Sequence, residues 1–307
     1  MIHYARRVNV DLAVVVVAYN SAHVLPGLLD SLPAGLDGLQ AQVIVVDNGS
    51  TDGGPDQLSG RSDCQLVRSS NTGYSGGINR GVRLAEPGVP ILILNPDVRL
   101  RPGSVPAMLS ALAIPGTGIV APQVRGSDGE LHLSLRRAPS IPRAMGLTKT
   151  RLPVFSEYIY EPEAYRESRL VDWALGAALL VSRECHDALG GWDESYFLYS
   201  EETDFCLRAA DLGFGTRYQP AAVVEHIGGQ SGQSAATHTM QVINRVRLYR
   251  RRHGLLASWG YYLISLLNEA SRIPRSGRRR SVAAVRALLR PRLRPAELGC
   301  SDRLLPS

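Results

Sequence analysis

The sequence predicts an α/β protein with a central, mostly parallel sheet and a helical C-terminal segment. Apolar runs rich in β-branched residues, such as LAVVVVAY at 12–19 and QVIVVDN at 42–48, alternate with helix-like stretches. These runs are continuous rather than alternating, which is typical of strands covered on both faces. Strand–helix alternation favours parallel strands joined by crossover helices. From about residue 237 the pattern becomes helical.

The individual elements are expected in a regular order. The first half predicts, in turn, strand 12–19, helix 22–32, strands 42–48 and 64–69, a helix opening near Gly76, strand 89–97, helix 103–113 and strand 117–124. A stretch at about 125–170, rich in Arg, Pro and Tyr, predicts loops over the sheet. The remainder predicts a strand and helix start at 169–184, a loop into a helix at 190–213, a strand at 215–229 and helices at 237–254, 255–272 and 278–294.

Composition indicates a soluble globular protein, with 44% hydrophobic and 20% charged residues in 307. An apolar run follows Arg6 and Arg7, as in a signal peptide, but no small-residue cleavage site follows it, so we interpret the run as a buried strand. The cysteines are scattered and form no CxxC pair, which suits a reducing cytosol and argues against a zinc site. They are Cys64, Cys185, Cys206 and Cys300.

Positive charge is concentrated near the C-terminus. Residues 245–294 hold fourteen arginines and one acid, Glu269, whereas the whole chain carries only +6. Within this segment LLASWGYYLISLL is 13 residues long, too short to span a bilayer. Apolar residues flanked by arginines predict an element that lies on an anionic leaflet. The alternatives are a helix hairpin that caps the preceding domain, or nucleic-acid binding, which we do not expect.

Polar side chains follow three of the predicted strands at their carboxyl ends. Asn20, Asp47 and Asp97 each stand where an apolar run stops. In an open α/β sheet, ligands bind in the crevice outside these strand ends. Asx residues also make turns after strands, but three of them, within DNGSTD and NPD contexts, favour a binding site.

The candidate site motifs each have a structural alternative. No GxGxxG or GxxxxGK[ST] is present, but NTGYSGGINRG at 71–81 opens a helix and predicts either an anion site or a tight turn. Asp97 offers a hard oxygen ligand for a divalent cation. His226 is either a second ligand of the same cation or a structural histidine. Glu201, Glu202 and Asp204 stand at the start of a helix. Either the helix dipole alone explains these acids, or one of them serves as a general base.

Together these motifs resemble the inverting family 2 glycosyltransferases. Seven stretches occur in the order seen in that family over about residues 10–230: VVVAYNS, VVDNGSTDG, NTGYSGGINRG, LILNPDV, GAALLVSRE, GGWDESYFLYSEETDFCLRA and VVEHIGG. The DNGS and NPD forms are most similar to the bacterial rhamnosyltransferases of cell-wall and O-antigen assembly. That branch includes mycobacterial enzymes that act on decaprenyl-diphospho-N-acetylglucosamine.

The resemblance implies a GT-A fold and a division of the chain. Residues 1–236 would be the catalytic domain, with a nucleotide-sugar half at about 1–124 and an acceptor half at about 125–236. Residues 237–307 would be the basic, membrane-associating helical region. Two strand-end positions would hold Mg²⁺ or Mn²⁺ bridging the donor diphosphate, namely Asp97 and His226.

The resemblance also implies the remaining roles. Glu202 would be the base, in a Glu201–Glu202 pair where relatives usually carry Asp at the second position. The positions implied near the acceptor are Trp173, Gly176 and Asp193. The positions implied for the nucleotide sugar are Ala18, Asn20, Asp47, Asn48, Asn71, Gly73, Gly77, Asn79 and Asn95.

The expected activity is transfer of L-rhamnose from dTDP-rhamnose to a polyprenyl-diphosphate-linked sugar, by a peripheral protein at the cytoplasmic face of the membrane. UDP-galactofuranose or a UDP-hexosamine are alternative donors, and the motifs specify no oligomeric state. A sugar-phosphate nucleotidyltransferase would carry a Gly-rich Arg/Lys loop after the first strand, and AYNSAHVLPG has none. A non-enzymatic sugar-binding module would not need Asp97, Glu202 and His226 together.

Overall fold

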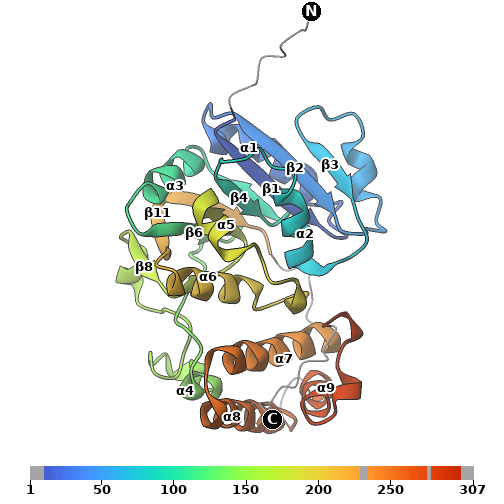
Figure 1. Cartoon of the computed structure of the whole chain (residues 1–307), viewed down its shortest axis with the longest axis vertical. Coiled ribbons are helices and arrows are strands. Elements are labelled where there is room, and N and C mark those ends of the chain that lie inside the picture. The colour runs from blue at the N-terminus through green and yellow to red at the C-terminus, as the bar shows by residue number, and fades with distance from the viewer. Residues whose placement is uncertain (1–9, 229–233, 275–277, 299–307) are drawn as a thin grey trace, which may run out of the picture.

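The computed structural model describes residues 10–228, 234–274 and 278–298. Parts of the predicted C-terminal region, at 275–277 and 299–307, lie outside the described residues, as do Cys300, Arg6 and Arg7 and the end of the predicted strand at Gly229. A sheet flanked by helices forms one part of the molecule, and three helices stand below it at the C-terminal end (Figure 1).

The central sheet has nine strands, in the order β3-β2-β1-β4-β10-β6-β11-β5, with β8 also paired to β11. The four strands from β3 to β4 are mutually parallel, and so are β6 and β11. The strands are β1 Leu12–Ala18, β2 Ala41–Asp47, β3 Gln65–Arg68, β4 Ile91–Leu94, β5 Val98–Leu100, β6 Thr117–Arg125, β8 Arg169–Val171, β10 Ala178–Val181 and β11 Gly215–His226. The predicted α/β class with a mostly parallel sheet is confirmed.

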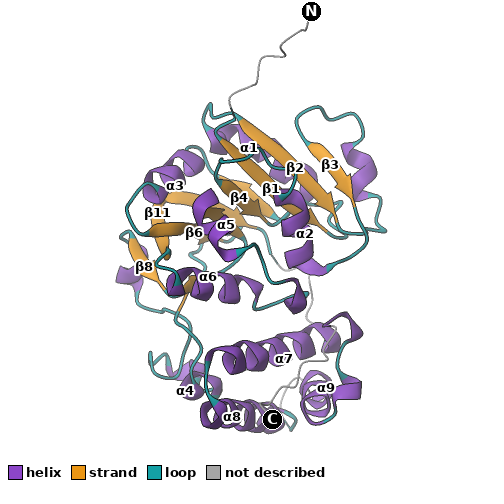
Figure 2. Ribbon diagram, viewed as in Figure 1, coloured by secondary structure: helices purple, strands orange, loops and turns teal. Residues whose placement is uncertain are grey.

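Helices cover both faces of this sheet, as the continuous apolar runs predict (Figure 2). Every residue of β1 is buried. Val14 and Val16 join the core cluster that contains side chains of α1 and α3, whereas Val15 and Val17 join the one that contains α2 and α6. These helices are α1 Leu25–Leu36, α2 Gly73–Val82, α3 Ser104–Leu112 and α6 Glu201–Asp211, with the short α5 Arg183–Leu189 beside α6.

The two predicted halves of the catalytic region are interleaved in the sheet. β10 runs antiparallel between β4 and β6, although it lies much later in the sequence than either. β5 pairs with β11 on the far edge. The small sheet of β7 Leu135–Arg136 and β9 Trp173–Ala174, and the helix α4 Ile141–Ala144, belong to the irregular stretch that the composition predicts.

The C-terminal segment forms three packed helices, α7 Ala235–Arg252, α8 Leu255–Arg272 and α9 Arg278–Leu289. Their shared core includes Ile243, Tyr261 and Leu288, and reaches Phe197 and Tyr199 of the preceding domain. The segment therefore packs against the part of the chain that precedes it. None of the helices in the described ranges combines the length and the apolar character needed to cross a bilayer.

Candidate active site

The crevice begins where β1 and β2 end side by side. Ala18 and Asp47 are partners in the parallel register, and the backbone N–H of Asn48 donates to the carbonyl of Ala18. Asp47 accepts a hydrogen bond from the N–H of Ser50 on Oδ1, at 2.9 Å, and Asn20 accepts one from the N–H of Thr51, at 2.8 Å. The two loops that follow the strands are thereby joined, and together they form the wall predicted for the nucleotide.

Asn48 joins this wall to the start of α2. Its Nδ2 donates to Oδ1 of Asn71 at 3.1 Å and to the carbonyl of Gly73 at 2.9 Å. Its Oδ1 accepts from the N–H of Thr72. The 71–81 motif is therefore fixed against the strand ends by side-chain amides, and Gly73 takes a left-handed φ of 79° as the helix begins.

Asp97 and His226 come together at the other side of the crevice. The antiparallel pairing of β5 with β11 sets His226 opposite Val98, and Nε2 of His226 lies 3.2 Å from Oδ2 of Asp97. Both side chains keep about a fifth of their surface exposed. Burial alone would raise the pKa of Asp97, but the hydrogen bond and charge of His226 outweigh it and hold that pKa below its usual value.

This donor set fits a divalent cation held jointly with a substrate. A carboxylate oxygen and an imidazole nitrogen converge on one point that solvent can reach. Within the described ranges, no cluster of three or more His, Cys, Asp or Glu side chains is arranged to hold a metal. A cation at Asp97 and His226 would therefore take its other ligands from water and diphosphate oxygens, as Mg²⁺ commonly does.

The carboxylates of Glu201 and Glu202 open α6 beside the crevice. The Oε2 atoms of both are buried and have no hydrogen-bond partner among the described residues. Burial raises the pKa of both carboxyls, and for Glu201 the neighbouring Glu202 raises it further. Carboxyls that bind protons more tightly than usual suit general-base chemistry.

Tyr74, which the sequence analysis did not single out, links a position predicted for the nucleotide sugar to one predicted for the acceptor. Its hydroxyl donates to Oδ1 of Asn95 at 2.7 Å and lies 3.4 Å from the carbonyl oxygen of Gly176. A Cβ added at Gly176 would lie 3.3 Å from Cβ of Glu202, so the predicted acceptor position is next to the predicted base. Tyr74 is the one aromatic residue of the glycine-rich motif at 71–81.

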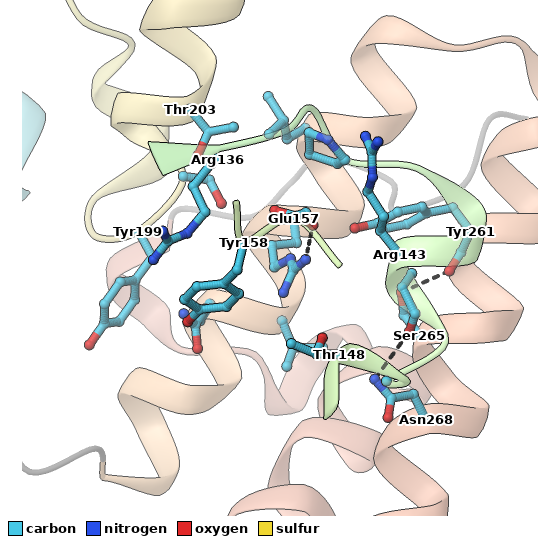
Figure 3. Close-up of a pocket in the computed structure, with 18 of the residues that line it drawn as sticks. Arg136, Arg143, Thr148, Glu157, Tyr158, Tyr199, Thr203, Tyr261, Ser265 and Asn268 are labelled. Atoms are coloured by element: carbon cyan, nitrogen blue, oxygen red, sulfur yellow. Dashed lines mark hydrogen bonds and ion pairs between the residues drawn. The ribbon is translucent and has the colours of Figure 1, made fainter. Parts of the chain in front are cut away.

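A cavity of about 300 Å³ extends from Glu202 toward the C-terminal helices (Figure 3). Trp173 and Tyr199 line it together with Glu202, and Ser265 and Asn268 line it from α8. The guanidinium carbon of Arg136 lies 3.8 Å from the centroid of the Tyr158 ring in the same wall. Aromatic faces beside hydrogen-bonding groups and a base are suited to a sugar acceptor.

Comparisons with known proteins identify the family. The profile of Glycosyl transferase family 2 matches residues 13–166. The chain belongs to glycosyl transferase family 2. It is 33% identical over 247 residues to the N-acetylglucosaminyl-diphospho-decaprenol L-rhamnosyltransferase of Mycobacterium tuberculosis, covering 74% of this chain and 80% of that one. It is also 27% identical to the low-salt glycan biosynthesis hexosyltransferase Agl10 of Haloferax volcanii, covering 65% of this chain and 61% of that one.

Solved structures show that the fold of this glycosyltransferase is GT-A. The structure of GalNAc-T7 with UDP, GalNAc and Mn²⁺ superposes with a TM-score of 0.62 at 13% identity, over 91% of this chain and 56% of that one. The Pyrobaculum calidifontis mannosyltransferase PcManGT with GDP-Man and Mn²⁺ gives a TM-score of 0.56 at 18% identity, over 91% and 80%.

Three of the predicted nucleotide positions make structural contacts in the glycosyltransferase. A Cβ at Gly77 would lie 2.6 Å from Cγ1 of Val17, so this glycine lets α2 pack closely on β1. A Cβ at Gly73 would meet the backbone of Phe197. Asn79 accepts from the N–H of Trp192 at 2.9 Å and donates to its carbonyl, which fixes the 190–194 loop to α2.

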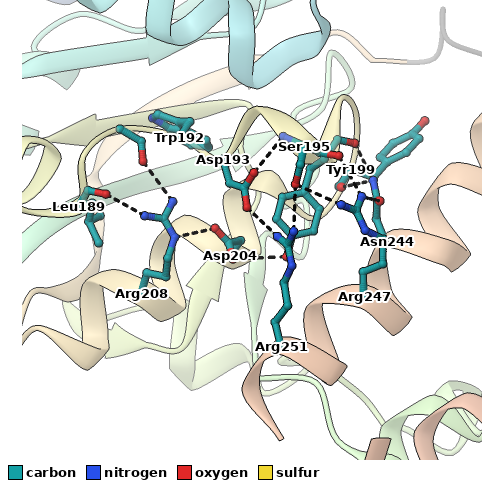
Figure 4. Close-up of polar contacts among 12 residues, drawn as sticks. Leu189, Trp192, Asp193, Ser195, Tyr199, Asp204, Arg208, Asn244, Arg247 and Arg251 are labelled. Atoms are coloured by element: carbon teal, nitrogen blue, oxygen red, sulfur yellow. Dashed lines mark hydrogen bonds and ion pairs between the residues drawn. The ribbon is translucent and has the colours of Figure 1, made fainter. Parts of the chain in front are cut away.

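The predicted acceptor residue Asp193 is held by the C-terminal helices (Figure 4). Its Oδ2 pairs with Arg251 at 2.6 Å, and its Oδ1 accepts from the N–H of Ser195. These bonds hold its pKa low against the effect of burial. Asp193 thereby fixes the loop that leads into α6 and Glu202.

Asn244 of α7 holds the same loop from below. Its buried Nδ2 donates to the carbonyls of Tyr196, Leu198 and Tyr199 at 2.7 to 3.0 Å. The loop needs this support because its non-glycine residues Phe197, Tyr199 and Ser200 have left-handed φ values of 56° to 72°. α7 is therefore part of the structure that positions Glu202, a contribution that the sequence analysis missed.

Proposed function

We propose that this glycosyltransferase moves L-rhamnose from dTDP-rhamnose to a polyprenyl-diphosphate-linked acceptor sugar in cell-wall polysaccharide assembly, with inversion at the anomeric carbon. The observation that carries the proposal is the 33% identity, over most of both chains, to a mycobacterial enzyme whose name specifies L-rhamnose and a diphospho-decaprenol acceptor. The enzyme works as a peripheral protein at the cytoplasmic face of the membrane, where such an acceptor is presented.

Glu202 removes the proton from the attacking acceptor hydroxyl. Glu202 is among the residues that line the cavity, whereas Glu201 is not, and Oε2 of Glu202 has no hydrogen-bond partner within the described residues. Attack from the face opposite the leaving diphosphate inverts the anomeric centre, as in inverting hydrolysis, where a base activates the nucleophile on one face. One carboxylate is sufficient for this step, because the leaving group is already a weak base.

In this proposal, Asp97 and His226 would hold Mg²⁺ or Mn²⁺ next to the donor. The cation would neutralise the charge that develops on the departing nucleoside diphosphate. Asp47 keeps Oδ2 free of hydrogen bonds among the described residues, so this oxygen is available to the nucleotide base. Asn48 and Asn71 fix the backbone that surrounds it.

A panel of nucleotide sugars, followed by thermal shift with Mn²⁺, tests the donor. A ligand at about 100 times its Kd stabilises the folded state by roughly 2.7 kcal/mol. We expect dTDP-rhamnose to give the largest shift and to transfer rhamnose to a diphosphate-linked N-acetylglucosamine acceptor, detected by mass and by the anomeric NMR signal. A larger shift and faster transfer with UDP-galactofuranose or a UDP-hexosamine would overturn the choice of donor. Retention of the anomeric configuration would overturn the single-base mechanism.

A further inference from the structure

One side of α8 presents leucines and a tryptophan to solvent. Leu256 is 87% exposed and Leu267 is 63% exposed, far more than leucines in a soluble helix usually are. The exposed positions 255, 259, 263 and 267 recur every four residues and therefore share one face, and Leu256 lies at the side of this face. We call this the α8 outer face, made of Leu255, Leu256, Trp259, Leu263 and Leu267.

A second exposed apolar element lies against α8. The 145–154 loop exposes Met145, Leu147, Leu152 and Val154. The loop is fixed to α8, because Nδ2 of Asn268 donates to the carbonyl of Ala144 at 3.1 Å, next to where the loop begins. A Cβ on Gly146 would lie only 2.2 Å from Oδ1 of Asn268, which shows how closely the two elements approach.

The charge around these two elements is almost entirely positive. Across the described residues of 234–298 the only acids are Glu269 and Glu297, and Glu269 is buried and bonded to His238. Exposed cations are present on the same loop, at Lys149 and Arg151, and on the neighbouring helix α9, at Arg279, Arg280 and Arg286. A surface that combines exposed leucines with cations complements an anionic lipid leaflet.

The same two elements form the outer walls of the cavity that contains Glu202. Gly146 and Thr148 line it from the loop, and Ser265, Asn268 and Arg272 line it from α8 (Figure 3). On α8 these lining positions lie on the side opposite the outer face, since residues 265 and 263 are two apart in a helix. The cavity therefore sits behind the apolar surface, one helix diameter from it.

We propose that the α8 outer face and the 145–154 loop together bind an anionic phospholipid surface. The leucines and Trp259 enter the boundary between head groups and acyl chains, and the surrounding cations contact phosphates. A lipid-anchored acceptor would then be presented beside the cavity that contains Glu202. The lipid contact rests only on the exposed residues, whereas the acceptor route rests on the proposed function. A second copy of this chain is a poor occupant, because cationic surfaces would oppose each other.

Vesicle co-sedimentation with the full chain tests the lipid contact. We expect binding to phosphatidylcholine vesicles that contain phosphatidylglycerol, weaker binding without it, and loss of binding at high salt. Tryptophan emission should shift to the blue on binding, and this shift should disappear in Trp259→Phe while sedimentation persists.

Two sets of substitutions separate the elements. The triple variant Leu256→Ser, Leu263→Ser, Leu267→Ser should weaken vesicle binding by about tenfold or more, and so should Leu147→Ser with Leu152→Ser in the loop, because each removes apolar groups from the lipid boundary. Leu212→Ser is the matched control, since Leu212 is 55% exposed at the end of α6 and lies outside this surface. All targets are exposed, so thermal melts should stay unchanged.

The result that overturns the proposal is unchanged vesicle binding in both sets of variants, or equal binding to neutral vesicles. A concentration-dependent dimer in gel filtration that the same substitutions abolish would instead assign the surface to self-association. Transfer to a water-soluble, short-chain acceptor should be unaffected in every variant. If no donor supports transfer, the proposed function fails while the vesicle result stands on its own.

Discussion

Nε2 of His226 lies 3.2 Å from Oδ2 of Asp97, although the two residues are 129 positions apart in the sequence. The contact exists because β11 runs antiparallel to β5. The last residue of β11, His226, pairs with Val98, the first residue of β5, and Asp97 directly precedes Val98. The N–H of Ile227 also donates to the carbonyl of Asp97, which fixes the backbone of both partners. The geometry of this pair therefore depends on the sheet and not on a flexible loop.

Asp97→Ala should abolish metal-dependent turnover and leave the fold intact. Loss of Lewis-acid assistance costs several kcal/mol, so a decrease of at least about 10²-fold in kcat is expected. The measurement is turnover against Mn²⁺ concentration. Glu225→Gln is a suitable control, because Glu225 precedes His226 and pairs with Arg101 at the surface. Full activity of the native enzyme in EDTA would contradict this prediction.

Glu202→Gln should lower the single-turnover rate by about 10²–10⁴-fold, the range typical of a lost general base. Donor affinity should change little, since the residues predicted to hold the diphosphate and the nucleotide lie elsewhere in the crevice. Glu201→Gln should be milder, because Glu201 does not line the cavity. If Glu201→Gln proves to be the inactive variant, the base is the other carboxylate.

The buried carboxyl pair should make stability depend on pH. Burial raises the pKa of both groups above the usual 4.5, so the folded state binds protons more tightly than the unfolded state. The resulting stabilisation is complete below the unfolded pKa and is lost as pH rises through the folded pKa. Glu201→Gln should therefore be more stable than the native protein at pH 8, with a difference that shrinks toward about pH 4.

Urea unfolding of both proteins over this pH range measures the difference. The control is Glu130→Gln, in an exposed turn, which should follow the native profile. Catalysis has the opposite requirement, because Glu202 must be ionised to act as a base. A native enzyme that becomes more stable than Glu201→Gln as pH rises would refute the account of the buried pair.

Asn244→Ala should destabilise the folded state and lower activity together. The substitution leaves carbonyls of Tyr196, Leu198 and Tyr199 without their donor, and an unsatisfied buried polar group costs about 1–3 kcal/mol. Thermal unfolding and turnover should both be measured. Asn268→Ala is the control, since Asn268 makes one bond to the carbonyl of Ala144 and should cost less stability. Equal melting temperatures for the two variants would contradict the role of Asn244.

The strands of the catalytic region were predictable because burial on both faces leaves a local signal, as in the apolar run of β1. The positions of Asn20, Asp47 and Asp97 after the carboxyl ends of strands were predictable for the same reason, since each follows such a run. The antiparallel insertion of β10 was not predictable, because ALLV pairs equally well in either direction and tertiary contacts decide which.

The supporting residues left weaker signals. Asn244 contacts a loop more than forty residues away, and only its place beside Ile243, on the apolar side of an arginine-rich helix, hinted at burial. Tyr74 appeared as one residue of a glycine-rich turn, and its link to Asn95 depends on how α2 meets β4. Both roles depend on contacts between distant elements, which no local pattern records.

The place of β10 between β4 and β6 has a consequence for how the protein is made. Translation proceeds from the N-terminus at about 5–20 residues per second, so β4 and β6 leave the ribosome well before the strand that joins them. During that interval the edge of β4 that later pairs with β10 has backbone N–H and C=O groups without partners, and its apolar side chains are not yet covered. Such an edge favours pairing with other chains. The nascent chain should consequently depend on chaperones until Ala178–Val181 has been synthesised, and expression of the first half alone should give aggregates.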